Sequence, residues 1–145
     1  MAFLHQLRKG VKYSVAKNIQ ATGLTHMFTT RIGGVSSAPL DTLNLGVGRK
    51  DSKENIMENY KRACACIKVN PAKCVLAKQV HETNIRVVGH EDSGKGLTRP
   101  TDFESADGLA TNSWGLPLVV FYADCVPLLL WDPVTKSMAV LHAGW

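Results

Sequence analysis

Three side chains able to bind a metal stand at similar places along the sequence, each at the end of an apolar stretch. His81 follows Val80, Cys125 separates two apolar runs, and His142 ends the stretch Ala139-Val140-Leu141. A strand end presents a side chain to a site while the strand holds the backbone in place. Two imidazoles and one thiolate form the donor set of a catalytic zinc or copper site whose fourth position stays open to water or substrate. The residue types are therefore compatible with a metal centre.

The spacing of these three residues leaves other interpretations open. Separations of 44 residues from His81 to Cys125 and 17 from Cys125 to His142 are not those of a zinc finger. Nothing local forces the three side chains together. Cys125 and His142 would equally serve as a nucleophile and its general base. Separate structural roles are the remaining interpretation.

Two further polar residues are candidates for ligand binding, each with a structural alternative. Arg31 stands beside Gly33-Gly34, and a guanidinium together with exposed backbone N–H groups can hold a phosphate. A two-glycine turn is also an ordinary loop feature. Asn44 lies between two leucines, where its amide either faces a ligand or ties down the loop.

The elements that must position these residues follow from the hydrophobic pattern. Apolar residues at helical spacing predict the one clear helix over residues 52–68, with Asp51 and Glu54 as its capping box. Residues 1–22 predict an edge strand or a draped arm. A turn at residues 132–136 predicts a hairpin of the last two strands. The pattern predicts strands at residues 24–30, 75–80, 84–88, 108–111, 118–123, 126–131 and 138–142.

Two apolar runs, residues 118–122 and 128–130, are continuous rather than alternating, as in strands covered on both faces. With one clear helix, the layers needed to cover them are not all present. The stretch 138–145 supports the same expectation, because it reads as an apolar strand without a polar tail. The sequence therefore predicts a single domain over residues 1–145 that is truncated at its C-terminus.

The composition is that of a soluble globular protein, with 45% hydrophobic and 20% charged residues. No apolar run has the ~18 to 20 residues of a membrane span, and the start lacks the apolar segment of a secretory signal. We therefore expect a cytoplasmic protein without membrane association. In that setting Cys64, Cys66 and Cys74 are expected to be thiols outside any disulfide.

The charge is distributed unevenly along the chain. Residues 1–78 hold 13 Lys and Arg against 4 Asp and Glu, whereas residues 79–145 hold 4 against 8. A clustered positive field attracts anions. The basic residues are spread over several predicted elements with few aromatics between them, so we expect no nucleic-acid partner.

Six short motifs occur in an order that resembles one known family. They are Phe28–Ser36, Leu43–Gly46, Gln79–His81, Ala106–Thr111, Ala123–Pro127 and His142–Trp145. Together they resemble the YfiH-type family, whose members are also described as polyphenol oxidases or laccase-domain proteins, peptidoglycan editing factors and purine nucleoside phosphorylases. Family members continue past the last motif with an arginine and a glycine, a helix and further strands.

The resemblance implies a fold and a metal site. The fold is an α/β protein of the α/β/β/α layered-sandwich type, distantly similar to the catalytic domain of cytotoxic necrotizing factor toxins. This chain would be the N-terminal part of that domain. The implied metal ligands are His81, Cys125 and His142, with zinc as the metal or copper as the alternative.

The resemblance also implies roles for residues around the metal. Arg31, Asn44, Gln79 and Asp124 match motif positions near the site. Asp124 and Arg31 join Cys125 as catalytic candidates, and Arg31, Asn44 and Gln79 are the substrate-binding candidates. Asp124 would act as a proton shuttle or support the ligand beside it, with a structural hydrogen bond as the alternative.

The function that the resemblance implies is a metal-dependent purine nucleoside phosphorylase that also deaminates adenosine. Its partners would be small molecules, a purine nucleoside and phosphate. One alternative is a cysteine hydrolase or amidase that edits peptidoglycan precursors with Cys125 as nucleophile. Others are a copper-dependent polyphenol oxidase and a binding or editing partner without catalysis. The oligomeric state does not follow from the sequence.

Overall fold

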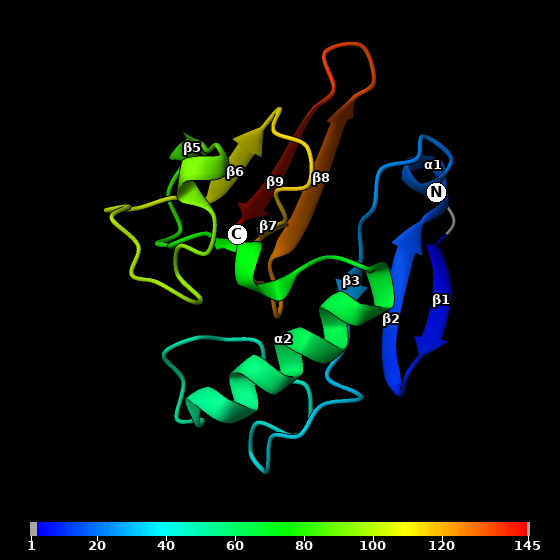
Figure 1. The fold of residues 1–145 in the computed structure, drawn as a ribbon, viewed down its shortest axis with the longest axis vertical. Coiled ribbons are helices and arrows are strands. Elements are labelled where there is room, and N and C mark those ends of the chain that lie inside the picture. Colours follow the sequence, from blue (N-terminus) through cyan, green and yellow to red (C-terminus); the bar gives the residue numbers. More distant parts are fainter. Residues whose placement is uncertain (1–2, 145) are drawn as a thin grey trace. The chain divides into compact units, whose positions relative to one another are not determined.

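The computed structural model describes residues 3–144, so Trp145 of the last motif lies outside the described residues. The chain divides into two compact units, Met1–Asn70 and Pro71–Trp145. Both units contain β-sheet, and the first also contains the long helix (Figure 1). The architecture is therefore mixed α/β, as the sequence predicts.

The first unit contains a three-stranded antiparallel sheet in the order β1-β2-β3. Its strands are β1 (Phe3–Arg8), β2 (Val11–Ala16) and β3 (Phe28–Thr29), and a short helix, α1 (Lys17–Gln20), follows β2. The expectation of an edge strand or an arm for residues 1–22 is correct in part, because β1 is the edge strand of this sheet, but residues 3–16 form a hairpin of two strands. Its turn is Lys9-Gly10, where both residues have positive φ, 51° and 82°. Lysine is an uncommon residue in that conformation, so the turn gives little sequence signal.

The predicted helix is α2 (Lys53–Ile67). Its N-cap is Ser52, whose side chain accepts a hydrogen bond from the Asn55 backbone N–H, so the prediction of Asp51 as the cap is wrong. Asp51 instead accepts hydrogen bonds from the Ser52 backbone and the Asn55 side chain. The helix contacts β2, and Cys66 joins the apolar cluster that β2 forms with Leu43.

The second unit contains two sheets. A four-stranded sheet has the order β5-β6-β9-β8, in which β5 and β6 are parallel and the other neighbours antiparallel (Figure 1). A small parallel pair joins β4 to β7. The strands are β4 (Val75–Leu76), β5 (Ile85–Val87), β6 (Gly108–Thr111), β7 (Leu118–Val119), β8 (Val126–Asp132) and β9 (Ser137–Ala143). The predicted β8–β9 hairpin is confirmed, whereas β4 and β7 are shorter than predicted.

The two faces of the four-stranded sheet differ in burial. On one face Leu109 and Val140 pack into an apolar core with Val75, Phe103 and Leu116. The register places alternate residues of the strands on the opposite face. We call this opposite face the open face, because its larger side chains are exposed or partly exposed: Ile85, Val87, Val126, Leu128, Leu130 and Leu141. The sequence predicts that the layers covering residues 128–130 are not all present in this chain, and the exposure of Leu128 and Leu130 agrees with that prediction.

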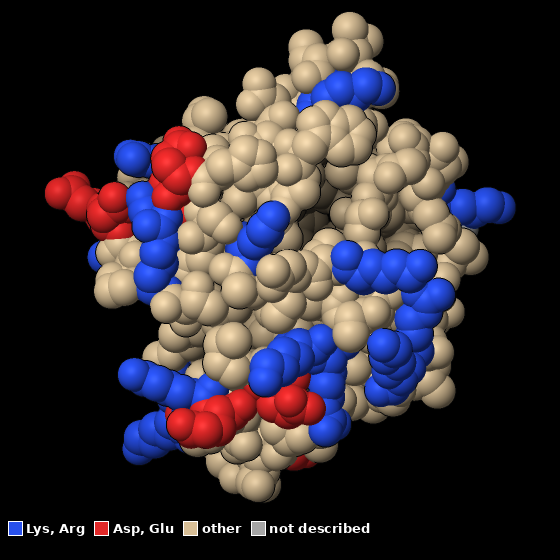
Figure 2. Space-filling view, viewed as in Figure 1, with Lys and Arg blue, Asp and Glu red and all other residues tan. Residues whose placement is uncertain are grey.

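Three further features of the described chain concern membrane spans, cysteines and surface charge. None of the helices among residues 3–144 has the length and apolar character that crossing a membrane requires. No disulfide joins the four cysteines, all of which lie within the described residues. Figure 2 shows Lys and Arg side chains in separate groups on the face in view, several of them beside Asp or Glu.

Candidate metal centre

The structure brings the three predicted metal ligands together in the second unit. The potential ligand atoms of His81, Cys125 and His142 all lie within 4.8 Å of one another. Cys125 Sγ is 4.0 Å from His81 Nε2, and the two imidazole rings meet edge to face with centroids 4.6 Å apart. His142 comes from β9, Cys125 from the turn before β8, and His81 from the segment between β4 and β5. Long-range pairing of the strands therefore provides the convergence that the sequence spacing did not.

Asp107 connects two of these ligands and is the functional residue that the sequence analysis did not single out. Its Oδ1 accepts hydrogen bonds from the backbone of His81 and from Nδ1 of His142, both at 2.9 Å. Its Oδ2 accepts from the backbone N–H groups of Val80 and Glu82, both at 3.0 Å. Each carboxylate oxygen thus receives two hydrogen bonds. The available signal was a carboxylate directly before β6, within the fourth motif.

The electrostatics of Asp107 follow from these four hydrogen bonds. Burial raises the pKa of Asp107, but the N–H donors from Val80, Glu82, His142 and His81 outweigh burial and lower that pKa to about 2. The carboxylate is therefore ionised at neutral pH. Because Nδ1 of His142 donates its hydrogen to Asp107, the Nε2 atom carries the lone pair that a metal would use.

His81 has a backbone conformation that needs support. Its φ is 64°, a region in which residues with a Cβ are uncommon. The three backbone hydrogen bonds to Asp107 hold this turn in place. Gly144 lies close to the ring, because a Cβ at that position would be 3.3 Å from His81 Cδ2. Asp107 thus holds the backbone of His81, and a side chain at position 144 would crowd its ring.

The donor set and its spacing fit a small divalent metal. Zinc bonds to histidine nitrogen and cysteine sulfur are ~2.0 to 2.3 Å long, so tetrahedral ligand atoms lie roughly 3.5 Å apart. Separations up to 4.8 Å in the described structure are within a small side-chain adjustment of that value. Two histidines and one cysteine leave a fourth position for water or substrate. The described residues thus fit either zinc or copper.

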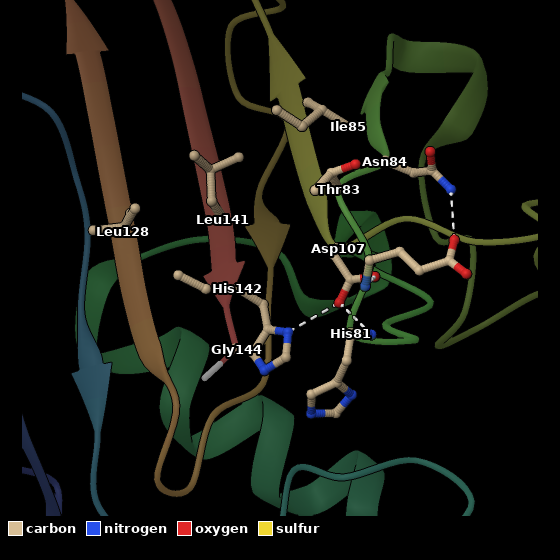
Figure 3. Close-up of a pocket in the computed structure, with 11 residues that line it drawn as sticks. His81, Thr83, Asn84, Ile85, Asp107, Leu128, Leu141, His142 and Gly144 are labelled. Atoms are coloured by element: carbon tan, nitrogen blue, oxygen red, sulfur yellow. Dashed lines mark hydrogen bonds and ion pairs between the residues drawn. The ribbon is translucent and has the colours of Figure 1, made fainter.

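The two histidines border a pocket of about 460 Å³. Asp107, Glu82 and Asn84 supply further polar groups to its lining. Figure 3 shows the two imidazole rings next to each other, with Asp107 linked to His142 and to the His81 backbone. The two histidines therefore adjoin a space in which a small substrate would fit.

Gln79 and Asp124 lie in the same unit as the candidate ligands. The Gln79 side chain donates to the carbonyl of Phe121 at 2.8 Å and accepts from its N–H at 2.6 Å. This pair of hydrogen bonds ties the segment before His81 to the segment before Cys125. Asp124 Oδ1 lies 3.9 Å from Cys125 Sγ, so the carboxylate is beside the thiol, as the sequence indicates.

Arg31 belongs to the first unit and already has a partner there. Its guanidinium pairs with the Asp41 carboxylate at 3.0 Å and donates to the Asp41 carbonyl at 2.6 Å. The N–H groups of Gly33 and Gly34, which the sequence suggested for phosphate, donate instead to Thr42 Oγ1. The phosphate role of these two backbone groups is therefore not supported. The glycines serve close packing, since a Cβ at either position would overlap neighbouring backbone atoms.

Asn44 ties down its loop, as one of its two interpretations predicts. Its amide donates to Asp51 at 2.9 Å and accepts from Gly46 at 3.0 Å. Hydrogen bonds from Asn44, Ser36 and Asn55 lower the pKa of Asp51 to about 2. Asn44 thus belongs to the network that holds the loop before α2.

A mixed α/β protein with a grouped His–Cys–His donor set is the class that this fold and site define. A family model described as Multi-copper polyphenol oxidoreductase laccase matches residues 25–145. The chain belongs to this family of laccase-like, YfiH-type proteins. The resemblance inferred from the six motifs is therefore confirmed.

Individual relatives carry a more specific name. The chain is 35% identical over 119 residues to "Purine nucleoside phosphorylase YlmD" of Bacillus subtilis. That alignment covers 81% of this chain and 43% of the relative. It is 35% identical over 126 residues to "Purine nucleoside phosphorylase YfiH" of Escherichia coli, covering 87% of this chain and 48% of the relative. The chain thus spans about half the length of these curated relatives.

Solved structures agree with the fold. The crystal structure of a Bacillus licheniformis protein described as hypothetical protein YfiH matches with a TM-score of 0.86 at 31% identity, covering 97% of this chain and 52% of that one. YlmD from Geobacillus stearothermophilus matches with a TM-score of 0.82 at 30% identity, covering 99% of this chain and 52% of that one. These matches confirm the predicted α/β fold class.

Proposed function

We propose that this chain carries the metal site of a purine nucleoside phosphorylase that also deaminates adenosine. The observation that supports the proposal is the grouping of His81, Cys125 and His142, in which the two histidines line a pocket and are held by the buried Asp107. The relatives named as purine nucleoside phosphorylases supply the substrate class. Zinc is the proposed metal, and copper is the alternative.

The chain's residues have distinct roles in this proposal. A bound metal with an open position would lower the pKa of its water toward ~7, which is what deamination at purine C6 requires. His81, Cys125 and His142 would hold the metal. Asp107 fixes the tautomer of His142, and Asp124 would accept and return a proton beside the site.

Phosphorolysis needs an anchored phosphate. In this reaction a phosphate oxygen bonds to C1′ of the ribose while the bond from C1′ to the purine nitrogen breaks. Arg31 remains the proposed cationic group, although it must exchange its Asp41 partner for the phosphate. Asn44 and Gln79 remain proposed substrate contacts. In the structure the Asn44 amide holds its loop, and the Gln79 amide joins two segments.

We also propose that both units form one domain, since the family match crosses their boundary, and that the protein is cytoplasmic.

The test combines metal content with nucleoside turnover. The purified chain should contain about one zinc, and Cys125→Ala should lose it, because one of three ligands is removed. Adenosine with phosphate should yield adenine, and adenosine alone should yield inosine, both followed by chromatography. Cys64→Ala, a change at another thiol, serves as the matched control. Full metal content and full phosphorolysis in Cys125→Ala would refute the site.

A second candidate function is supported by one specific contact. His142 Nδ1 lies 2.9 Å from Asp107 Oδ1. The potential ligand atoms of His142 and Cys125 lie within 4.8 Å of each other. A thiol, an imidazole and a carboxylate in this order are the components of a cysteine hydrolase. Such an enzyme would act on peptidoglycan precursors, as the resemblance suggests. A chain with no bound metal whose Cys125 reacts rapidly with iodoacetamide would favour this candidate.

Copper-dependent oxidation of phenols is the third candidate, and the family model's description supports it. Within residues 3–144 the His81–Cys125–His142 group is the one cluster of three potential ligands. Ordinary blue laccases need several coppers, which one such cluster does not provide. Activity that depends on oxygen and copper would favour this candidate over the nucleoside enzyme.

A further inference from the structure

The side chain of Gln79 extends the hydrogen-bonded pairing of β4 with β7. Beyond the paired residues of these two parallel strands, the Ala77 N–H donates to the Val119 carbonyl at 3.0 Å. In a parallel ladder the next bond falls two residues further along each chain and would join the Gln79 N–H to the Phe121 carbonyl. The Gln79 side chain makes this connection instead. Its Nε2 donates to the Phe121 carbonyl at 2.8 Å, and its Oε1 accepts from the Phe121 N–H at 2.6 Å.

The backbone on both sides of Gln79 is bound to a different segment. The Lys78 carbonyl accepts from the Ala106 N–H at 2.8 Å. The N–H groups of residues 80–82 donate to the carboxylate of Asp107. The main chain therefore turns away from β7 toward the segment before β6, while the Gln79 side chain stays bound to the segment after β7. One residue thus joins two segments of the candidate site.

Cys125 lies in the turn between β7 and β8, and each end of this turn is held by a segment that carries another candidate ligand. At one end β8 pairs with β9, which contains His142. At the other end the turn is bound by the amide of Gln79, two residues before His81 in the sequence. The Gln79 amide is therefore a direct connection between the backbone near His81 and the backbone near Cys125.

Glutamine has the chemistry that this connection requires. One side-chain amide supplies a donor for a carbonyl and an acceptor for an N–H. An ionised glutamate would place an acceptor against the Phe121 carbonyl, asparagine is one methylene shorter, and methionine has a similar length without a donor. The amide also keeps a second N–H and a second lone pair, so the connection is compatible with the proposed substrate contact of Gln79.

We infer that Gln79 is a positioning residue that sets the place of Cys125 in the candidate metal centre. The inference rests on the proposed function, because it concerns the thiolate ligand of the metal proposed there. Asp107 holds His81 and His142 through hydrogen bonds of its own, so loss of the Gln79 amide acts on the thiolate and leaves the two imidazoles in place. Removal of a partner that orients a ligand lowers metal affinity by about 10- to 100-fold.

The test uses cobalt(II), a coloured substitute for zinc, with the full chain. Gln79→Met keeps the length of the side chain and removes both hydrogen bonds. It should lower cobalt affinity by about 10- to 100-fold and weaken the sulfur-to-cobalt charge-transfer absorption more than the visible absorption of the bound metal. Thr111→Val is the matched control, because it also removes two hydrogen bonds of one side chain, at the end of β6 far from Asp107. The control should keep the affinity and the spectrum.

A second measurement needs no metal. Hydrogen exchange of the metal-free chain, followed by mass spectrometry, should be faster over residues 121–126 in Gln79→Met than in Thr111→Val. Unchanged cobalt affinity and spectrum in folded Gln79→Met, equal exchange in the two variants, or an equal loss of affinity in both overturns the inference. If the unmodified chain binds neither cobalt nor zinc, the proposed metal site is wrong, and the exchange measurement still decides whether Gln79 holds the turn.

Discussion

Replacement of Asp107 by asparagine should damage the candidate site without removing any of its ligands. Asparagine keeps one acceptor oxygen but turns the other into an NH₂ group, which then faces two N–H donors. At Oδ2 these donors are the backbone groups of Val80 and Glu82. At Oδ1 they are the His81 backbone and the His142 ring. An amide NH₂ at the Oδ2 position leaves two partly buried backbone donors unpaired, and one at the Oδ1 position leaves the His81 N–H unpaired and forces His142 into the other tautomer.

The magnitude follows from the pKa and the hydrogen bonds. The pKa of Asp107 falls from an ordinary 3.8 to about 2, which corresponds to about 2 kcal/mol of folding free energy carried by the ionised form. The side chain is only 3% exposed, so solvent screening is slight. The unpaired donors add about 1 to 2 kcal/mol, and the expected total loss is about 3 to 4 kcal/mol. Metal affinity should fall about 10- to 100-fold, because His81 and His142 lose their orientation.

Two assays check this prediction, urea unfolding for stability and zinc titration against a competing chelator for affinity. Asp102→Asn is the matched control, since Asp102 is an exposed carboxylate of the same unit that pairs with Lys95 at 2.7 Å. The control should bind zinc as the unmodified chain does. Wild-type zinc affinity in a folded Asp107→Asn protein would refute the orienting role of Asp107.

Three further outcomes are expected. Gln79→Leu should cost about 1 to 3 kcal/mol in urea unfolding, because both hydrogen bonds to Phe121 are lost; an unchanged midpoint would contradict the tie between the two segments. Asn59→Ala should cost about 3 kcal/mol, since this fully buried amide accepts from the Val35 N–H and donates to two oxygens; a loss below about 1 kcal/mol would argue against that network. The lowered pKa of Asp107 stabilises the fold above about pH 4, and this contribution should vanish as the pH falls through about 2. Circular dichroism during acid titration should therefore show an unfolding step in the unmodified chain that Asp107→Asn lacks.

The helix and the β8–β9 hairpin could be predicted because their signals are local. Helical spacing of apolar residues over 52–68 and a turn at 132–136 between two apolar runs are each contained in a short window. The β1–β2 hairpin was missed because its turn places Lys9 at positive φ, a position that turn statistics assign to glycine or asparagine. The parallel pair of β4 and β7 joins segments more than 40 residues apart, which no local pattern reports.

The candidate ligands could be predicted from their residue types and positions, but the side chain that holds them in place could not. His81, Cys125 and His142 were identified from their places at the ends of apolar runs, and the structure groups them. Asp107 was not, because its importance comes from four hydrogen bonds made across the fold rather than from its neighbours in sequence. The choice between a ligand-binding and a loop-holding amide at Asn44 likewise depended on contacts with Asp51 and Gly46.

The wide separation of the three candidate ligands along the chain links metal occupancy to folding. His81 and Cys125 stand 44 residues apart and meet only when β6, β8 and β9 have paired, so an unfolded chain offers no preformed site. A metal that binds only the folded unit stabilises it by mass action, by about 2.7 kcal/mol when its free concentration is 100 times the dissociation constant. Under the proposed function, a chelator would therefore act as a denaturant of this unit. Its melting temperature would then report the free metal concentration around the protein.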